Sequence, residues 1–160
     1  MSATLILNYL LTWGLLGSAA FSLIVVYLFR SGRVYDARTR EGHLKEDMPR
    51  KGMLNILSFL VLVIAFITAT NYLSLVSLGA TLAFWPLFSL NLALMLILVI
   101  FDTLVIDWWM IGLWRPAFLQ LPNEMDRQQM KVHIRRTLVV APPICLLIAL
   151  LSAGVTILLF

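Results

Sequence analysis

Apolar residues occur in three long runs that no charged residue interrupts. Residues 1–29, 52–101 and 137–160 contain no Asp, Glu, Lys or Arg. One helical crossing of the hydrocarbon core of a bilayer takes about 20 apolar residues. The outer runs therefore have the length of one crossing each, and the middle run has the length of two. The pattern predicts an all-α, polytopic membrane protein: an antiparallel four-helix transmembrane bundle that forms a single domain over residues 1–160.

Helices are expected because these runs lack the alternation of a barrel strand, and helices satisfy backbone polar groups in lipid. Polar residues that begin at Asn71 divide the middle run. Trp85 and Pro86 then supply an interfacial anchor and a proline suited to a first helical turn. Pro142 and Pro143 should kink or delay the last helix. We expect the helices at residues 4–29, 53–75, 86–109 and 139–160, with loops at 30–51 and 115–136.

Two helices carry small residues at helical spacing, a pattern that lets membrane helices approach closely. The first predicted helix has Gly14, Ser18 and Ser22, with Gly17 beside them. The last predicted helix has a second small face, made of Ala149, Ser152, Ala153 and Thr156. We interpret both as packing surfaces, and the partner of the first could be a helix of the same chain or of another copy.

Composition and charge agree with this interpretation and give it an orientation. The chain is 61% apolar and 12% charged, whereas soluble domains carry about 25% charge. All 12 cations lie in residues 30–51 and 115–136, so the positive-inside bias predicts that both loops are cytoplasmic and both termini are outside. The net charge of +4 lies beside membrane spans. Anionic lipid head groups are therefore the expected partner, and nucleic acid is not.

Two acids in the third predicted helix are the main candidates for a functional site. An acid within a span costs a few kcal/mol, so something must compensate it. Counting back from Arg115 at 1.5 Å per residue places Asp107 about 12 Å and Asp102 about 20 Å from the cytoplasmic surface. Five residues of α-helix turn through about 140°, so the two carboxylates should not share a face. Asn91, Asp102 and Trp109 should align instead.

These acids admit a functional and a structural interpretation. In the functional one, Asp102 binds a proton, a cation or the cationic group of a ligand, with Asn91 as its polar neighbour. In the structural one, both acids are neutral or are paired with Arg30, Arg33 or Arg115 reaching in from the loops. A protonated aspartate that only holds helices together is a form of the second interpretation.

Tryptophans and cations follow the acids and suggest contact with lipid head groups. Trp108, Trp109 and Trp114 form an aromatic belt before Arg115, which anchors the helix at the interface or lines a head-group pocket. Asn123 is expected to cap a further helix. That helix carries three cations at four-residue spacing, Arg127, Lys131 and Arg135. This basic stripe suits anionic lipid head groups, and the alternative is a solvated face without a specific partner.

Few residues suggest a cofactor, a metal or catalysis. His43 lies near Glu46 and Asp47, but a metal site takes three or four ligands in open geometry, so we expect no metal and no cofactor. An enzyme would have to use Asp107, Arg115 and His133 near the inner surface. Three functions remain open: a non-enzymatic carrier or accessory subunit, a lipid-acting enzyme at the cytoplasmic face, and a structural subunit of a homo-oligomer or larger membrane complex.

The third apolar helix also carries a recognisable pattern. It reads Asp102, four apolar residues, then Asp107 and Trp108, and it is followed by Arg115 and Pro116. This resembles a family of small bacterial four-helix integral membrane proteins with the same pattern and a proline-rich stop. The resemblance covers residues 101–122 and implies a bacterial inner membrane. It implies no catalytic or binding residue.

Membrane orientation gives the first testable prediction. Cysteines introduced near Ser77 and near the C-terminus should react with an impermeant thiol reagent added outside intact cells, because those segments carry no cations. Cysteines near Gly42 should react only after the cells are opened. Labelling of the Gly42 region in intact cells would reverse the predicted orientation.

Overall fold

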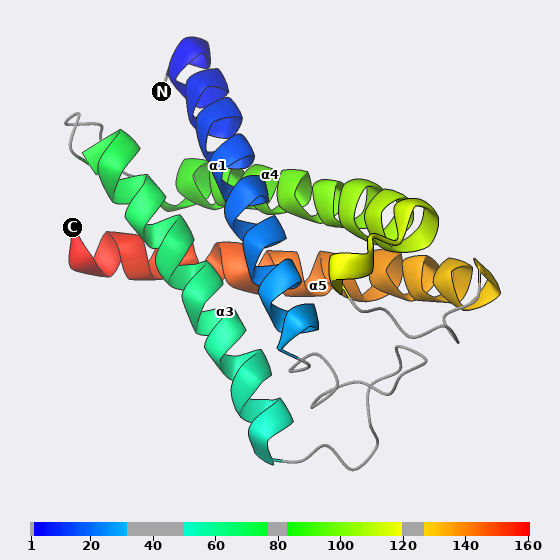
Figure 1. Ribbon diagram of the computed structural model, residues 1–160. Helices are drawn as coiled ribbons and strands as arrows, with labels where there is room; N and C mark the ends of the chain where they lie inside the picture. The colour runs from blue at the N-terminus through cyan, green and yellow to red at the C-terminus, as the bar shows by residue number, and fades with distance from the viewer. Residues whose placement is uncertain (1, 32–49, 77–82, 120–126) are drawn as a thin grey trace. The chain divides into compact units, whose positions relative to one another are not determined.

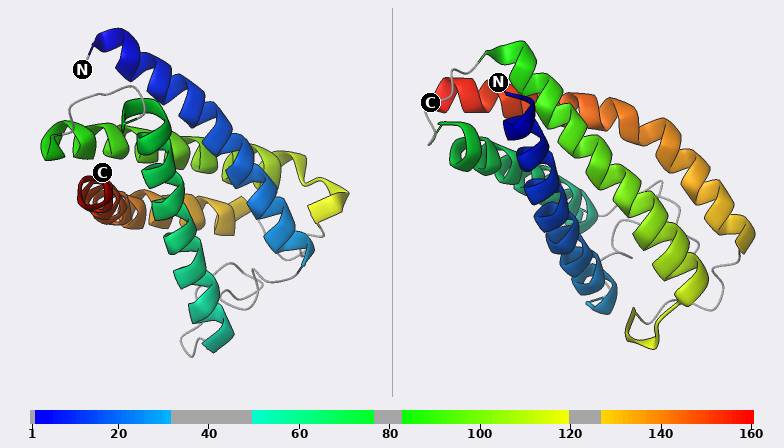
Figure 2. Two further views of the ribbon diagram at one scale, coloured as in Figure 1. Left: turned by 90° about the vertical axis from the view of Figure 1, so that its left-hand side faces the viewer. Right: turned by 90° about the horizontal axis from the view of Figure 1, so that it is seen from above.

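The computed structural model describes residues 2–31, 50–76, 83–119 and 127–160, which are helical almost throughout and contain no strand. Two long helices come first, α1 (Ala3–Arg30) and α3 (Arg50–Asn71), and α3 continues as a π-helix, η1 (Tyr72–Val76). Next come α4 (Phe84–Phe101), a second π-helix η2 (Asp102–Trp114) and the short 3-10 helix η3 (Ala117–Leu119). The last helix is α5 (Arg127–Leu159). Figure 1 shows this order from blue to red, and Figure 2 gives two further views.

Four of these helical stretches are long and apolar enough to cross a membrane. They are Ala3–Arg30, Arg50–Val76, Phe84–Trp114 and Thr137–Leu159. Many large apolar side chains on them are exposed, as a lipid-facing surface requires. The predicted all-α fold with four membrane-spanning helices is confirmed.

The last helix differs from the prediction at its start. It begins at Arg127, not near residue 139, and runs without a break through Pro142 and Pro143. Part of the predicted loop 115–136 is therefore helical. A proline inside a helix costs about 3 kcal/mol. Breaking the helix would, however, leave still more backbone groups unpaired in an apolar environment, which explains why the prolines interrupt no element here.

The chain divides into two compact units, and every long helix contributes to both. Unit 1 consists of Met1–Gly17, Phe59–Val99 and Ala141–Phe160. Unit 2 consists of Ser18–Ser58 and Ile100–Val140. Both termini therefore belong to unit 1.

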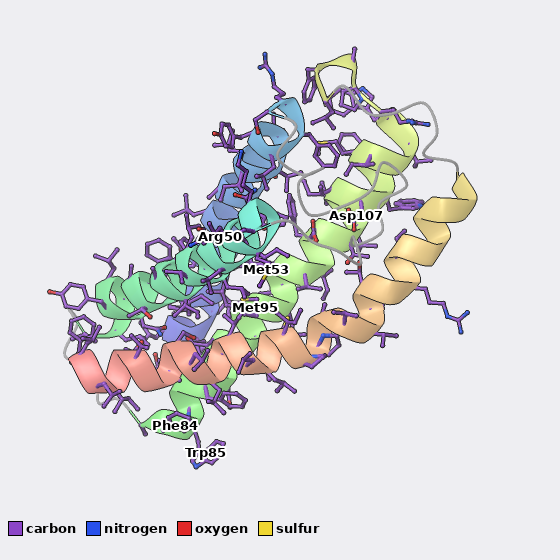
Figure 3. All side chains as sticks on the ribbon, turned by 90° about the horizontal axis from the view of Figure 1, so that it is seen from below. Arg50, Met53, Phe84, Trp85, Met95 and Asp107 are labelled. Atoms are coloured by element: carbon purple, nitrogen blue, oxygen red, sulfur yellow. The ribbon has the colours of Figure 1, made fainter. Side chains whose placement is uncertain are left out.

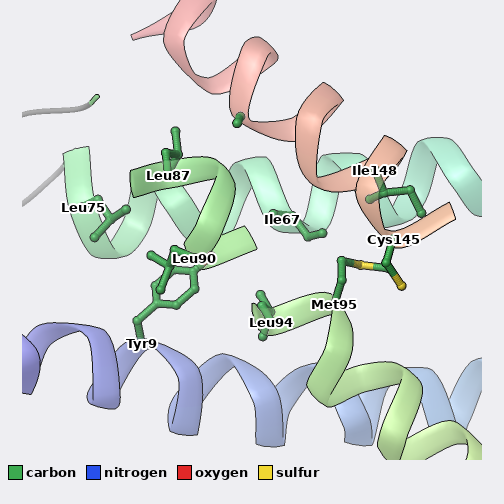
Figure 4. Close-up of a cluster of buried hydrophobic side chains, with 10 residues drawn as sticks. Tyr9, Ile67, Leu75, Leu87, Leu90, Leu94, Met95, Cys145 and Ile148 are labelled. Carbon is green, nitrogen blue, oxygen red and sulfur yellow. The ribbon is translucent and has the colours of Figure 1, made fainter. Parts of the chain in front are cut away.

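The core of unit 1 combines side chains from four helical segments. Leu90 of α4 lies beside Tyr9 of α1, and Met95 lies next to Cys145 of α5 (Figure 4). Leu94 of α4 and Ile67 of α3 belong to the same cluster. Unit 2 has its own cluster of buried side chains, with partly buried apolar residues of α1 and α5 packed against it. That cluster consists of Ile106, Met110, Ile111 and Leu119.

Glycines of α1 allow close helix packing within unit 1. A Cβ atom at Gly17 would lie 3.0 Å from Leu98 Cδ2 and 3.3 Å from the Phe66 ring, and one at Gly14 would lie 3.2 Å from Ile97 Cγ2. The first small-residue face therefore packs on α3 and α4 of the same chain. The second small face, on α5, is also buried. Both predicted packing surfaces are confirmed.

The glycine contacts predict the effect of enlarging these positions. Gly17→Leu should lower the free energy of unfolding by about 1–3 kcal/mol, the usual cost of overpacking, as measured by denaturant titration in detergent micelles. Gly154→Leu is the matched control, because a Cβ atom there would meet nothing within 4 Å. Equal stability of the two variants would contradict close packing at Gly17.

Candidate functional site

The acidic residues lie at the start of an unusual helix. The chain changes from α-helix to π-helix at Asp102 and keeps this geometry for 13 residues to Trp114. Arg115 then closes the segment in the left-handed region, at φ 46° and ψ 57°, and its N–H donates to the Met110 carbonyl at 2.8 Å. Long π-helices are rare, and π-helical turns are frequent at functional sites.

The π-helix changes the relation between the two acids. Its hydrogen bonds join residues five apart, so Asp107 follows Asp102 at one turn, as residues four apart do in an α-helix. The predicted separation of about 140° assumed α-helical geometry, which the structure does not have here. Asp102 and Asp107 therefore lie on adjacent turns of one side of η2.

Burial distinguishes the two carboxylates. Asp107 is 7% exposed and lies on the buried face of η2 with Thr103 and Ile106, whereas Asp102 is partly buried. Figure 3 labels Asp107 on this segment. Both aspartates interact with other groups of the protein. The Thr103 hydroxyl is buried and has no hydrogen-bond partner among the described residues.

The tryptophans after the acids face outward, as an aromatic belt requires. Trp108, Trp109 and Trp114 are each about half exposed. The Trp109 and Trp114 rings are 5.3 Å apart, and the Phe118 ring lies 6.0 Å from Trp114. Exposed tryptophans of this kind are typical of an interface between apolar and polar surroundings.

The predicted head-group cations are described only in part. Arg115 and Arg135 are exposed. Arg127 and Lys131 fall on α5, at four-residue spacing with Arg135, but their side chains lie outside the described part of the structure. The same holds for His133, the third residue of the possible enzymatic group.

Asn91 belongs to unit 1, whereas Asp102 belongs to unit 2. The Asn91 side chain is fully buried, and its Nδ2 donates to Ser152 Oγ of α5 at 3.1 Å. Its Oδ1 has no partner among the described residues. The polar neighbour that the structure gives Asn91 is thus a serine on another helix.

A buried polar network, which the sequence analysis did not identify, joins the helical segments of unit 1. The Tyr9 hydroxyl of α1 donates to Asn71 Oδ1 at 2.8 Å and lies 2.9 Å from Thr70 Oγ1. Asn71 Nδ2 donates to Thr156 Oγ1 at 3.0 Å, and Thr156 in turn donates to the Ser152 carbonyl at 2.7 Å. With the bond between Asn91 and Ser152, the network links α1, α3, α4 and α5.

The network can position helices but has no group that ionises readily near neutral pH. Its members are hydroxyls and carboxamides, which donate and accept hydrogen bonds. The sequence indicated part of this network, because the four-residue spacing of Ser152 and Thr156 places them on one face of the last helix. Asn71 is fully buried and connects two helices, whereas its position in the sequence suggested the edge of a span.

The residues considered for a metal site and for a helix cap lie outside the part of the chain that the structure describes. Among the described residues, no group of three or more His, Cys, Asp or Glu side chains could hold a metal ion. The predicted residues His43, Glu46, Asp47 and Asn123 lie outside the described ranges.

The network predicts a stability cost for removing its central amide. Asn71→Leu should lower the free energy of unfolding by about 1–3 kcal/mol, because it removes the acceptor of the buried Tyr9 hydroxyl and the donor to buried Thr156 Oγ1. Asn8→Leu is the control, since Asn8 is exposed on α1. In a double-mutant cycle, Tyr9→Phe and Asn71→Leu should be non-additive by about 0.6–1.7 kcal/mol. Additive effects would mean that the bond between Tyr9 and Asn71 contributes nothing.

No family model, curated protein or solved structure matches this chain. The resemblance carried by the Asp102 to Trp108 pattern therefore stays a prediction, and the function must be inferred from the site itself.

Proposed function

We propose that this protein is a small, non-enzymatic membrane carrier in which Asp102 and Asp107 together bind a proton or a cation. The observation that carries the proposal is the π-helix that begins at Asp102. It brings the two carboxylates onto adjacent turns of one side of the third span, where an α-helix would separate them.

Charge supports binding at this pair. Like charges on adjacent turns destabilise a helix, and an ionised acid within a span is costly. A proton or cation taken up by the pair relieves both costs. Asp107 lies on the same buried face as Ile106 and Met110, so its charge is poorly compensated by solvent. In this proposal, Asp102 and Asp107 both contribute a carboxylate to the binding site.

Membrane and orientation form part of the proposal. We place the protein in a bacterial inner membrane, with both basic segments in the cytoplasm and both termini outside. The charge pattern supports this, because all 12 cations lie in residues 30–51 and 115–136 and none lies in residues 1–29 or 137–160. Anionic head groups at the cytoplasmic face are the expected partners of these cations.

A second candidate is a structural or accessory subunit of a homo-oligomer or larger membrane complex. It is favoured by the interactions that Asp102 and Asp107 already make within the chain. Acids held by such partners could fix the helices without exchanging any ion. The two candidates differ in whether the carboxylates react with small reagents and ions.

Carbodiimide labelling tests the proposal in reconstituted vesicles. Hydrophobic carbodiimides modify protonated carboxyl groups in membrane spans, so labelling of Asp102 should fall as the pH rises. It should fall further when the transported cation competes, with Na⁺, K⁺ and Li⁺ as probes. If the two acids form one site, Asp102→Asn should change the labelling of Asp107, and Asp107→Asn should change that of Asp102.

The control is Asp47→Asn, which removes an acid from the basic segment and should leave labelling of the pair unchanged. Absence of labelling at every pH, in protein shown by thermal unfolding to be folded, would reject the carrier and favour the structural subunit. Independent labelling of the two acids would reject the shared site.

A further inference from the structure

A groove on the outer surface of unit 1 lies apart from the acidic site. It has a volume of about 520 Å³ and lies between α3, with its continuation η1, and the last turns of α5. It extends from Val61 of α3 to Tyr72 of η1, and on the other side it includes Val155 of α5 and Phe160, which follows α5. Its volume is within the range of ligand sites, about 300–1,000 Å³.

The lining of the groove is apolar apart from Thr68 and Tyr72. Ala65 and Ala69 are small and exposed, so they leave space between the larger side chains around them. Both helices are long and apolar enough to cross a membrane. The chemistry that fits such a lining is an aliphatic chain, because a polar occupant would find few hydrogen-bond partners.

Aromatic rings mark one end of the groove. Tyr72 and Phe160 lie with ring centroids 4.7 Å apart and planes tilted by 34°. Both are exposed and stand at the ends of their spans, where aromatic side chains collect at the level of lipid head groups. The aromatic pair therefore marks this end of the groove as the one expected at the level of the head groups.

The length of the groove indicates whether a lipid chain or a helix of a second copy occupies it. Val61 and Tyr72 are eleven residues apart, which is about 16 Å at 1.5 Å per residue. This is close to half of a hydrocarbon core of about 30 Å. A transmembrane helix of a second copy would extend through the full core, whereas an acyl chain of one leaflet ends near its middle.

We propose that this groove binds one acyl chain of a membrane glycerophospholipid, with the head group beside Tyr72 and Phe160. The lipid comes from the leaflet at the C-terminal end of α5. Ala65 and Ala69 form the floor that admits the chain. This binding is independent of the acidic site, which belongs to unit 2.

Photo-cross-linking tests the lipid site on the full chain. The protein is reconstituted in vesicles of phosphatidylglycerol and phosphatidylethanolamine that contain phosphatidylglycerol with a diazirine on one acyl chain. Cross-links located by peptide mass spectrometry should concentrate on residues 61–72 and 155–160. They should saturate as the fraction of probe rises and decrease when unlabelled phospholipid competes.

Filling the groove should abolish this preference. Ala65→Phe with Ala69→Phe should reduce cross-linking there to the level of the other lipid-exposed surfaces. Ala19→Phe with Ala20→Phe is the matched control, because these alanines are exposed on α1 outside the groove. Thermal unfolding shows whether each variant is folded, and the wild-type cross-link map remains decisive if the filled variant is not.

Two results would overturn the proposal. Even, non-saturating cross-linking over all exposed apolar faces would show contact with bulk lipid and no site. A disulfide-linked dimer formed efficiently by Ala69→Cys in vesicles, with the groove of the wild-type protein unlabelled, would identify a second copy as the occupant.

Discussion

Polar groups enclosed by apolar side chains must find their partners within the protein, and this constraint organises unit 1. The bond from Tyr9 to Asn71 joins the first span to the second, and the bond from Asn71 to Thr156 joins the second to the last. The apolar contacts around them, such as Leu90 and Leu94, are less directional. Hydrogen bonding therefore selects one register of the helices from the many that apolar packing alone would allow.

The same constraint acts on the backbone. In lipid a helix that ends early exposes groups with no donor or acceptor nearby, so the chain tolerates Pro142 and Pro143 inside α5 and extends the third span as a π-helix to Trp114. The helix ends only at Arg115, where the backbone is left-handed and the Arg115 N–H donates to the Met110 carbonyl. Strain of this kind in a residue other than glycine costs of the order of 1–3 kcal/mol.

The length and position of the apolar runs were enough to predict the fold. Close packing at Gly14 was also predictable, because it begins a series of small residues at four-residue spacing that continues with Ser18 and Ser22, and Gly17 lies beside that series. The π-helix was not, since residues 102–114 carry no sequence pattern that distinguishes bonding over five residues from bonding over four. The network was missed because Tyr9 and Asn71 are 62 positions apart, and their contact depends on how the helices pack.

The single cysteine of the chain has a consequence for how unit 1 can be observed. Cys145 is 1% exposed, so a thiol-specific dye can reach it only when the surrounding helices separate. The rate of dye incorporation then reports the free energy of local opening, as hydrogen exchange does for backbone amides. Dye incorporation at Cys145 therefore detects opening of unit 1 without any substitution, and no dye is incorporated while the core stays closed.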